Sequence, residues 1–143
     1  MPLLNYTTKV DIFTTLGQIE GMLVKHKARR ILKEYDDGGH VAAVSFEINT
    51  PVGIQVVRLP ANVESVQKVL AKQKVKCDYE QAERVAWRIV KDWVEAQMAI
   101  LESEMVTMDE IFMPYIVDNC GNTMYQLFAS SALQISAPQE GDR

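Results

Sequence analysis

Two histidines are the residues of this chain best suited to acid–base or metal chemistry. His26 and His40 lie in different predicted elements, and neither stands at the spacing of a paired Cys/His ligand set. His40 follows Asp36 and Asp37, whose carboxylates could bind a cation with it. The run Asp-Asp-Gly-Gly is also typical of a tight hairpin turn, which explains both carboxylates without a metal. We therefore predict no metal site.

A cluster of carboxylates near the end of a predicted long helix is the other candidate for catalysis. It comprises Glu102, Glu104, Asp109 and Glu110, and paired carboxylates can hold the divalent metals that cleave phosphodiesters. Glu110 stands three residues after Thr107, however, where a capping box uses it to begin a helix. No phosphate-binding glycine loop, nucleophile elbow or zinc-protease motif accompanies the cluster. We therefore expect no cofactor and no enzymatic activity.

Basic residues form a stronger candidate for a binding surface. One group stands at a predicted helix–strand junction, and the other stands at the end of a later helix. The first group is Lys25, Lys27, Arg29, Arg30 and Lys33, and the second is Lys72, Lys74 and Lys76. If the fold brings both together, they predict a groove that follows nucleic-acid phosphates and binds less tightly at high salt. A solvated face is the alternative, because only Tyr35 supplies a nearby ring for stacking on bases.

The charge of the chain is divided unevenly along its length. Residues 1–76 contain 11 basic and 7 acidic residues, whereas residues 77–143 contain 4 basic and 12 acidic residues, for a net charge of −4. A basic half can meet a polyanion, pair head to tail with an acidic half, or serve solubility alone. The asymmetry therefore favours a nucleic-acid partner without excluding self-association.

Tryptophan and methionine residues of the second half predict a different kind of surface. Trp87 lies near the polar boundary of the long helix, and Met98 and Met105 are among seven methionines in the chain. A half-exposed indole beside flexible thioethers can contact a protein partner, either a host or phage protein or a second copy. Plain filling of the core is the alternative interpretation.

Residues 80–102 predict one long helix around which the rest of the chain is organised. The segment contains no glycine or proline, and its apolar residues cover more than half of the helical circumference. Its polar strip contains Arg84, Arg88, Lys91 and Glu95. A helix with so wide an apolar surface needs cover on two sides. We expect a β-sheet on one side and the shorter helices that follow on the other.

Three segments with strand-like patterns predict an antiparallel meander. They are residues 29–35, 40–49 and 54–59, separated by the turns Asp-Asp-Gly-Gly and Asn-Thr-Pro-Val-Gly. Glycine in such turns supplies the positive φ that a tight hairpin needs. Residues 4–10 alternate as well, so we predict a further edge strand at the N-terminus.

Capping signals mark where the other helices begin. Thr15 and Gln18 form a Thr-x-x-Gln box that predicts a first helix over residues 16–27, and Asn62 predicts the start of a helix that runs to about Lys72. Further start signals are Asp78 for the long helix, Thr107 with Glu110 for a short helix that Pro114 ends, and Thr123 with Gln126 for a last helical segment.

Composition and length predict one α+β domain. With 143 residues, of which 48% are hydrophobic and 24% charged, the chain can bury roughly two-thirds of its unfolded surface. We predict a three- to four-stranded antiparallel meander covered by a C-terminal helical layer with one long central helix. This domain is expected to span residues 1–136, with a disordered tail at residues 137–143.

The same sequence predicts a cytoplasmic protein with no membrane partner. No apolar run reaches the roughly 18 residues of a membrane span, and the N-terminus lacks the regions of a signal peptide. Cys77 and Cys120 match no paired ligand spacing, so we expect free thiols in a reducing compartment.

Several short motifs resemble small uncharacterised proteins encoded by bacterial prophages and other mobile elements. The motifs are Asn5-Tyr6-Thr7-Thr8, Glu34-Tyr35-Asp36, Val44-Ser45-Phe46, Arg58-Leu59-Pro60, Glu83-Arg84, Ala86-Trp87-Arg88, Trp93-Val94, Ala96-Gln97 and Phe112-Met113-Pro114-Tyr115. The resemblance spans about residues 5–128 and implies a bacterial or phage cytosol. It implies no catalytic residue.

These observations lead to two functional expectations. The first is a non-enzymatic accessory protein of a phage or mobile element that associates with nucleic acid through its basic N-terminal half. The alternative is a protein-interaction module, either an inhibitor of a host factor or a homo-oligomer, that uses the surface around Trp87, Met98 and Met105.

Overall fold

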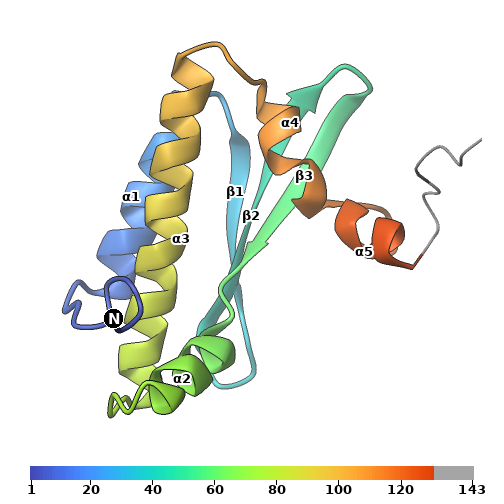
Figure 1. Ribbon diagram of the computed structural model, residues 1–143. Helices are drawn as coiled ribbons and strands as arrows, with labels where there is room; N and C mark the ends of the chain where they lie inside the picture. Colours follow the sequence, from blue (N-terminus) through green and yellow to red (C-terminus); the bar gives the residue numbers. More distant parts are fainter. Residues whose placement is uncertain (131–143) are drawn as a thin grey trace, which may run out of the picture.

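A computed structural model of the chain describes residues 1–130, so the predicted tail and the end of the predicted domain lie outside the described residues. The order of elements is α1 (Ile12–Lys25), β1 (Arg29–Tyr35), β2 (Val41–Thr50), β3 (Gly53–Pro60), α2 (Val63–Lys72), α3 (Tyr79–Glu102), α4 (Met108–Phe112), the 3₁₀ turn η1 (Met113–Tyr115), β4 (Ile116–Val117) and α5 (Met124–Ala129). The predicted α+β class is confirmed (Figure 1).

The predicted meander is confirmed, and β4 extends it to four strands. The strands pair antiparallel in the order β1-β2-β3-β4. Gly39, in the first hairpin turn, and Gly53, which begins β3 directly after the second, have φ of 79° and 114°, conformations that glycine adopts without strain. Asp36 Oδ1 supports the first turn by accepting hydrogen bonds from the backbone N–H groups of Gly38 and His40, both at 2.9 Å.

The prediction of a strand over residues 4–10 is wrong. The segment forms turns that lie against α3. Asn5 Nδ2 donates to Asp92 Oδ2 at 2.7 Å, and the Gln81 amide donates to two backbone carbonyls of the segment at 3.1 and 2.9 Å. Polar side chains of α3 therefore satisfy backbone groups that a strand would pair within the sheet, and alternation over so short a stretch does not reveal this.

Helix α1 begins before the position that its predicted capping box indicates. Asp11 is the N-cap, and its carboxylate accepts a hydrogen bond from the backbone N–H of Phe13 at 3.0 Å. Thr15 lies inside the helix, fully buried, and its hydroxyl oxygen accepts a hydrogen bond from Arg88 at 3.3 Å. The Thr15 box is therefore a wrong prediction, because a better cap stands one turn upstream.

The other predicted start signals are confirmed. Asn62 Oδ1 accepts from the Ser65 N–H at 3.1 Å at the start of α2, and Asp78 Oδ1 accepts from the Gln81 N–H at 2.8 Å at the start of α3. Capping boxes begin α4 at Thr107 and α5 at Thr123. Pro114 lies in η1, where the α-helix has ended.

The core lies between one face of the sheet and the helices. Its buried side chains on the strands are Val41, Val44, Phe46, Ile48, Val57 and Leu59, and those on the helices are Leu16, Ile19, Leu23, Trp87, Val94, Met98, Ile111 and Phe112. Figure 1 shows α1 beside α3, with α2 at the end of α3 near the β1–β2 hairpin and α4 near β2 and β3.

The prediction that the helices following α3 cover its second side needs correction. Its main helical neighbours are α1 and α2, which precede it in the sequence. Of the elements that follow, Phe112 of α4 and Tyr115 of η1 pack against Trp93 of α3. Helical periodicity gives the width of an apolar surface but does not say which element covers it.

Candidate functional site

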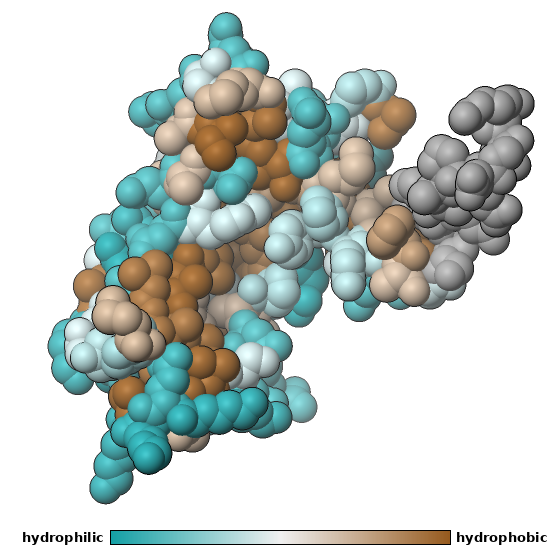
Figure 2. Space-filling view, in the orientation of Figure 1, coloured by the Kyte–Doolittle hydropathy of each residue, from teal (hydrophilic) through white to brown (hydrophobic). Residues whose placement is uncertain are grey.

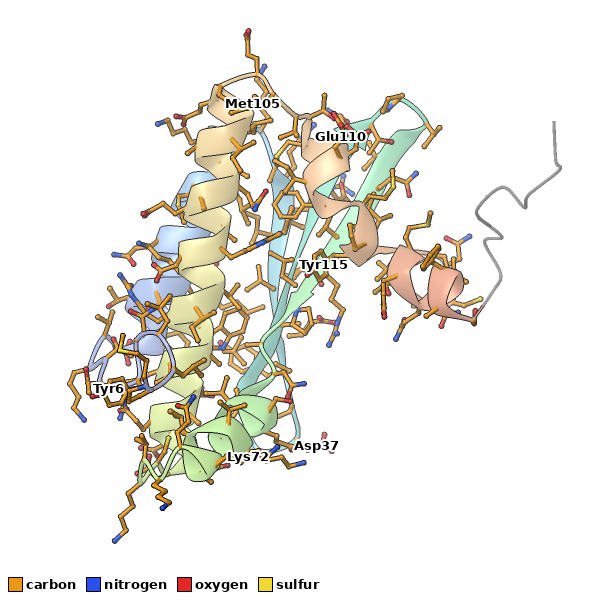
Figure 3. The ribbon with its side chains drawn as sticks, in the orientation of Figure 1. Tyr6, Asp37, Lys72, Met105, Glu110 and Tyr115 are labelled. Atoms are coloured by element: carbon orange, nitrogen blue, oxygen red, sulfur yellow. The ribbon has the colours of Figure 1, made fainter. Side chains whose placement is uncertain are left out.

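The two predicted basic groups lie at opposite ends of the molecule. Lys25 lies at the far end of α3, where its Nζ is 3.6 Å from Glu102 Oε1, whereas the second group lies at the last residue of α2 and in the connection from α2 to α3. The 24 residues of α3, at about 1.5 Å each, separate these ends by about 36 Å. Figure 3 shows Lys72 and Met105 at opposite ends. The two groups therefore form no common groove within one chain.

The α1–β1 basic group consists of Lys25, Lys27, Arg29 and Arg30, and the lysine end consists of Lys72, Lys74 and Lys76. Lys33 belongs to neither group, because its Nζ lies 2.9 Å from Glu20 Oε1 and forms an ion pair between β1 and α1.

Internal carboxylates neutralise part of the α1–β1 basic group. Arg30 Nη1 lies 3.6 Å from Glu47 Oε2, and Lys25 is paired with Glu102 as described above. A phosphate bound at either cation would compete with its glutamate. This group therefore offers less free positive charge than its residue count indicates.

The lysine end carries exposed charge that is not paired within the described part of the chain. Lys72, Lys74 and Lys76 are exposed, and among residues 1–130 no ion pair includes them. The backbone that holds them is fixed, because the N–H of Val75 donates to the Leu70 carbonyl at 2.9 Å. Lys74 has a φ of 61° at this tight helix end.

The structure corrects the predicted partner surface around Trp87. This side chain is fully buried, and its Nε1 donates to the Val41 carbonyl at 3.3 Å. Met98 is buried as well, whereas Met105, in the loop after α3, is 72% exposed. The apolar arc of α3 is so wide that even its edge lies in the core. The three residues therefore share no surface.

Trp93 lines an apolar groove that the sequence interpretation missed. The groove has a volume of about 220 Å³ and is lined by Leu59, Pro60, Ile89, Val90, Trp93 and Tyr115. The Trp93 ring packs edge to face on Phe112 and Tyr115, with centroids 5.7 and 5.8 Å apart. Figure 2 shows hydrophobic residues gathered over α3 on this face of the molecule. The only sequence signal for this groove was the position of Trp93 on the apolar arc of α3. That signal did not show that Trp93 lines a groove whereas Trp87 is fully buried.

The face of the sheet opposite the core carries a polar network among exposed aliphatic side chains. Glu34 Oε2 accepts from Arg58 Nε at 2.7 Å and from Ser45 Oγ at 3.2 Å, which links β1, β2 and β3. On this face Leu32 is 63% exposed and Ile54 is 61% exposed. Both side chains are thus accessible to another molecule.

A cavity of about 280 Å³ beside the β1–β2 hairpin gathers titratable groups, with Asp36, Glu64 and Tyr79 in its lining. Burial, followed by the charges of Asp36, Glu83 and Glu64, raises the pKa of the Tyr79 hydroxyl. The His40 ring packs edge to face on Tyr79, with centroids 4.7 Å apart, and its Nδ1 lies 3.0 Å from Oε2 of the buried Glu83. These contacts join the hairpin to α3.

His26 is held between two acceptors at the other end of α3. Its Nδ1 lies 2.7 Å from the Met22 carbonyl, and its Nε2 lies 2.9 Å from Glu102 Oε1. The hydrogen bond from His26, followed by the charge of Lys25, lowers the pKa of the Glu102 carboxyl.

Among residues 1–130, no three His, Cys, Asp or Glu side chains lie close enough together to hold a metal ion.

Cys77 and Cys120 are free thiols, and burial, followed by the charge of Asp78, raises the pKa of Cys77. No helix in the described range combines the length and hydropathy that crossing a membrane requires.

Comparison of the chain with family models, with curated proteins and with solved structures gave no match.

Proposed function

We propose that this chain is a non-enzymatic accessory protein that binds nucleic-acid phosphates through the lysine end. The supporting observation is that Lys72, Lys74 and Lys76 are exposed, closely spaced and unpaired within the described residues. Ammonium groups in such an arrangement replace condensed counterions on the nucleic acid, and this release drives binding. The bacterial prophage or mobile-element setting belongs to the proposal and rests on the sequence resemblance alone.

The chemistry of the lysine end favours binding that tolerates many sequences. Lysine contacts phosphates as a point charge, and phosphate contacts fix position without reading bases. The ring of Tyr79 lines a shallow cavity of about 440 Å³ together with Lys68 and Glu64. The Glu64 carboxylate repels phosphate there. We therefore expect contacts to the nucleic-acid backbone to dominate over base stacking.

Fluorescence anisotropy of labelled single- and double-stranded oligonucleotides, measured over a range of salt concentrations, tests this proposal. The variant combines Lys72→Gln, Lys74→Asn and Lys76→Gln, with asparagine chosen because it tolerates the positive φ of Lys74. Loss of three cations should reduce the slope of log K against log salt by about 2 for single strands and about 3 for duplexes. Unchanged affinity and slope in this variant, or no binding by the wild type at low salt, would refute the proposal.

A control variant separates this local effect from net charge. Val52→Glu, Tyr125→Glu and Phe128→Glu together change the charge by the same amount at exposed positions outside the lysine end. Its salt slope should stay close to that of the wild type. An equal loss in both triple variants would mean that total charge, and not the lysine end, controls binding.

A further inference from the structure

β1 is an open edge of the sheet. It is the first strand in the order β1-β2-β3-β4, and in the described part of the chain its only strand partner is β2. Unpaired edges are templates for strand pairing unless charge or a covering element protects them. Lys33, the lysine of this strand, is paired with Glu20 of α1 and leaves the edge with less repulsive charge.

The exposed side chains of β1 have a self-complementary order. Arg30 contacts Glu47, and Glu34 contacts Ser45 and Arg58, all on the face opposite the core. Leu32 pairs in register with Ser45 on the same face and is largely exposed. Arg30 and Glu34 thus flank the apolar Leu32, and each stands two residues from it along the chain.

We propose that two copies of this chain associate through β1 as a two-fold symmetric dimer. An antiparallel arrangement about an axis at Leu32 brings the two Leu32 side chains together and places each Arg30 opposite Glu34 of the second copy. Opposite charges and apolar pairs facing each other across neighbouring strands stabilise a sheet. The two four-stranded sheets then form one continuous sheet.

The local geometry of β1 defines how far this pairing extends. Register shifts lie between Arg29 and Leu32 and between Glu34 and Tyr35, and Arg30 has a φ of 51°. The new backbone ladder therefore covers residues 31–33 of each copy, and the Arg30–Glu34 ion pairs close its two ends. The Arg30 side chain is 77% exposed, and both internal contacts of Glu34 use Oε2 alone, so each group can reach the second copy.

Sedimentation velocity from micromolar to millimolar concentration, without nucleic acid, tests the dimer independently of the proposed function. Leu32→Lys places two like charges together at the axis and should weaken association at least about tenfold. Ile54→Lys is the matched control. Ile54 lies on β3, on the same face of the sheet as Leu32, and it is 61% exposed, compared with 63% for Leu32. It should leave the dimer unchanged.

Charge complementation identifies the axis directly. Leu32→Lys and Leu32→Glu should each sediment as monomers, and an equimolar mixture should form a heterodimer because the introduced charges then attract. A wild type that stays monomeric at every concentration overturns the proposal. So does a dimer that survives Leu32→Lys, or a mixture of the two variants that does not associate.

Discussion

Trp87 carries a hydrogen bond in the core as well as apolar contacts. Trp87→Phe removes the indole donor and leaves the buried Val41 carbonyl without this partner, so we expect the free energy of unfolding to decrease by about 1–3 kcal/mol. Trp93→Phe, in the wall of the groove, should cost less than about 1 kcal/mol. Urea denaturation followed by circular dichroism measures both. Equal losses would contradict the different environments of the two indoles.

Glu102 makes the stability of the fold depend on pH in a defined direction. Its contacts with His26 and Lys25 lower its pKa in the folded state. A carboxylate of this kind adds stability above its unfolded pKa of about 4.3 and loses the contribution as the pH decreases through the folded value. Glu102→Gln should therefore be less stable than the wild type near neutral pH, and the difference should vanish in acid.

Urea midpoints measured in steps from neutral to acidic pH check this prediction. Glu104→Gln is the control, because Glu104 is exposed and forms no ion pair among the described residues. A Glu102→Gln curve parallel to that of the wild type throughout the range would show that the contacts with Lys25 and His26 do not persist in solution.

At the scale of elements, the sequence predicted best the helices and hairpins that short local signals mark. The hairpin glycines and the caps at Asn62, Asp78, Thr107 and Thr123 act within a few residues of the chain, and the structure confirms the elements that they begin or join. One wrong prediction, the Thr15 box, gave way to another local signal, the cap at Asp11, whereas the other depends on distant partners. The strand over residues 4–10 is displaced by side chains of α3, which lie far away in the sequence.

The start of α1 tests which of two neighbouring local signals caps the helix. Asp11→Ala removes the carboxylate that caps the helix, so the free energy of unfolding should decrease by about 1 kcal/mol. Thr14→Ala, at an exposed position in the first turn, should be neutral or slightly stabilising, because alanine has the higher helix propensity. Urea denaturation compares the two variants, and an equal effect would contradict Asp11 as the cap.

At the scale of the whole molecule, the sequence predicted the basic residues but not their arrangement. Whether the α1–β1 basic group and the lysine end converge depends on the direction of α3, which places them about 36 Å apart. Ion pairs such as Lys33–Glu20 likewise join residues of different elements. Counting charges along a chain gives no information about either relation.

The proposed dimer changes this arrangement. β1 runs from the end that holds the α1–β1 basic group towards the hairpin, and the lysine end lies near that hairpin, as Figure 3 shows for Lys72 and Asp37. Because the two copies of β1 run antiparallel, the lysine end of one copy lies at the same end of the dimer as the α1–β1 basic group of the other. A long oligonucleotide can then contact the lysine end of one copy together with Lys27 and Arg29 of the other, which form no ion pair among the described residues.

Leu32→Lys and Ile54→Lys test this consequence, because they add the same charge to the same face and differ in whether the dimer forms. At concentrations where the wild type is dimeric, Leu32→Lys should bind a long oligonucleotide about tenfold more weakly than Ile54→Lys, since linked sites bind more tightly than separate ones. Anisotropy titrations at fixed salt measure both affinities. If the affinities are equal and only Leu32→Lys is monomeric, the lysine end binds nucleic acid in each copy separately and the dimer has another role.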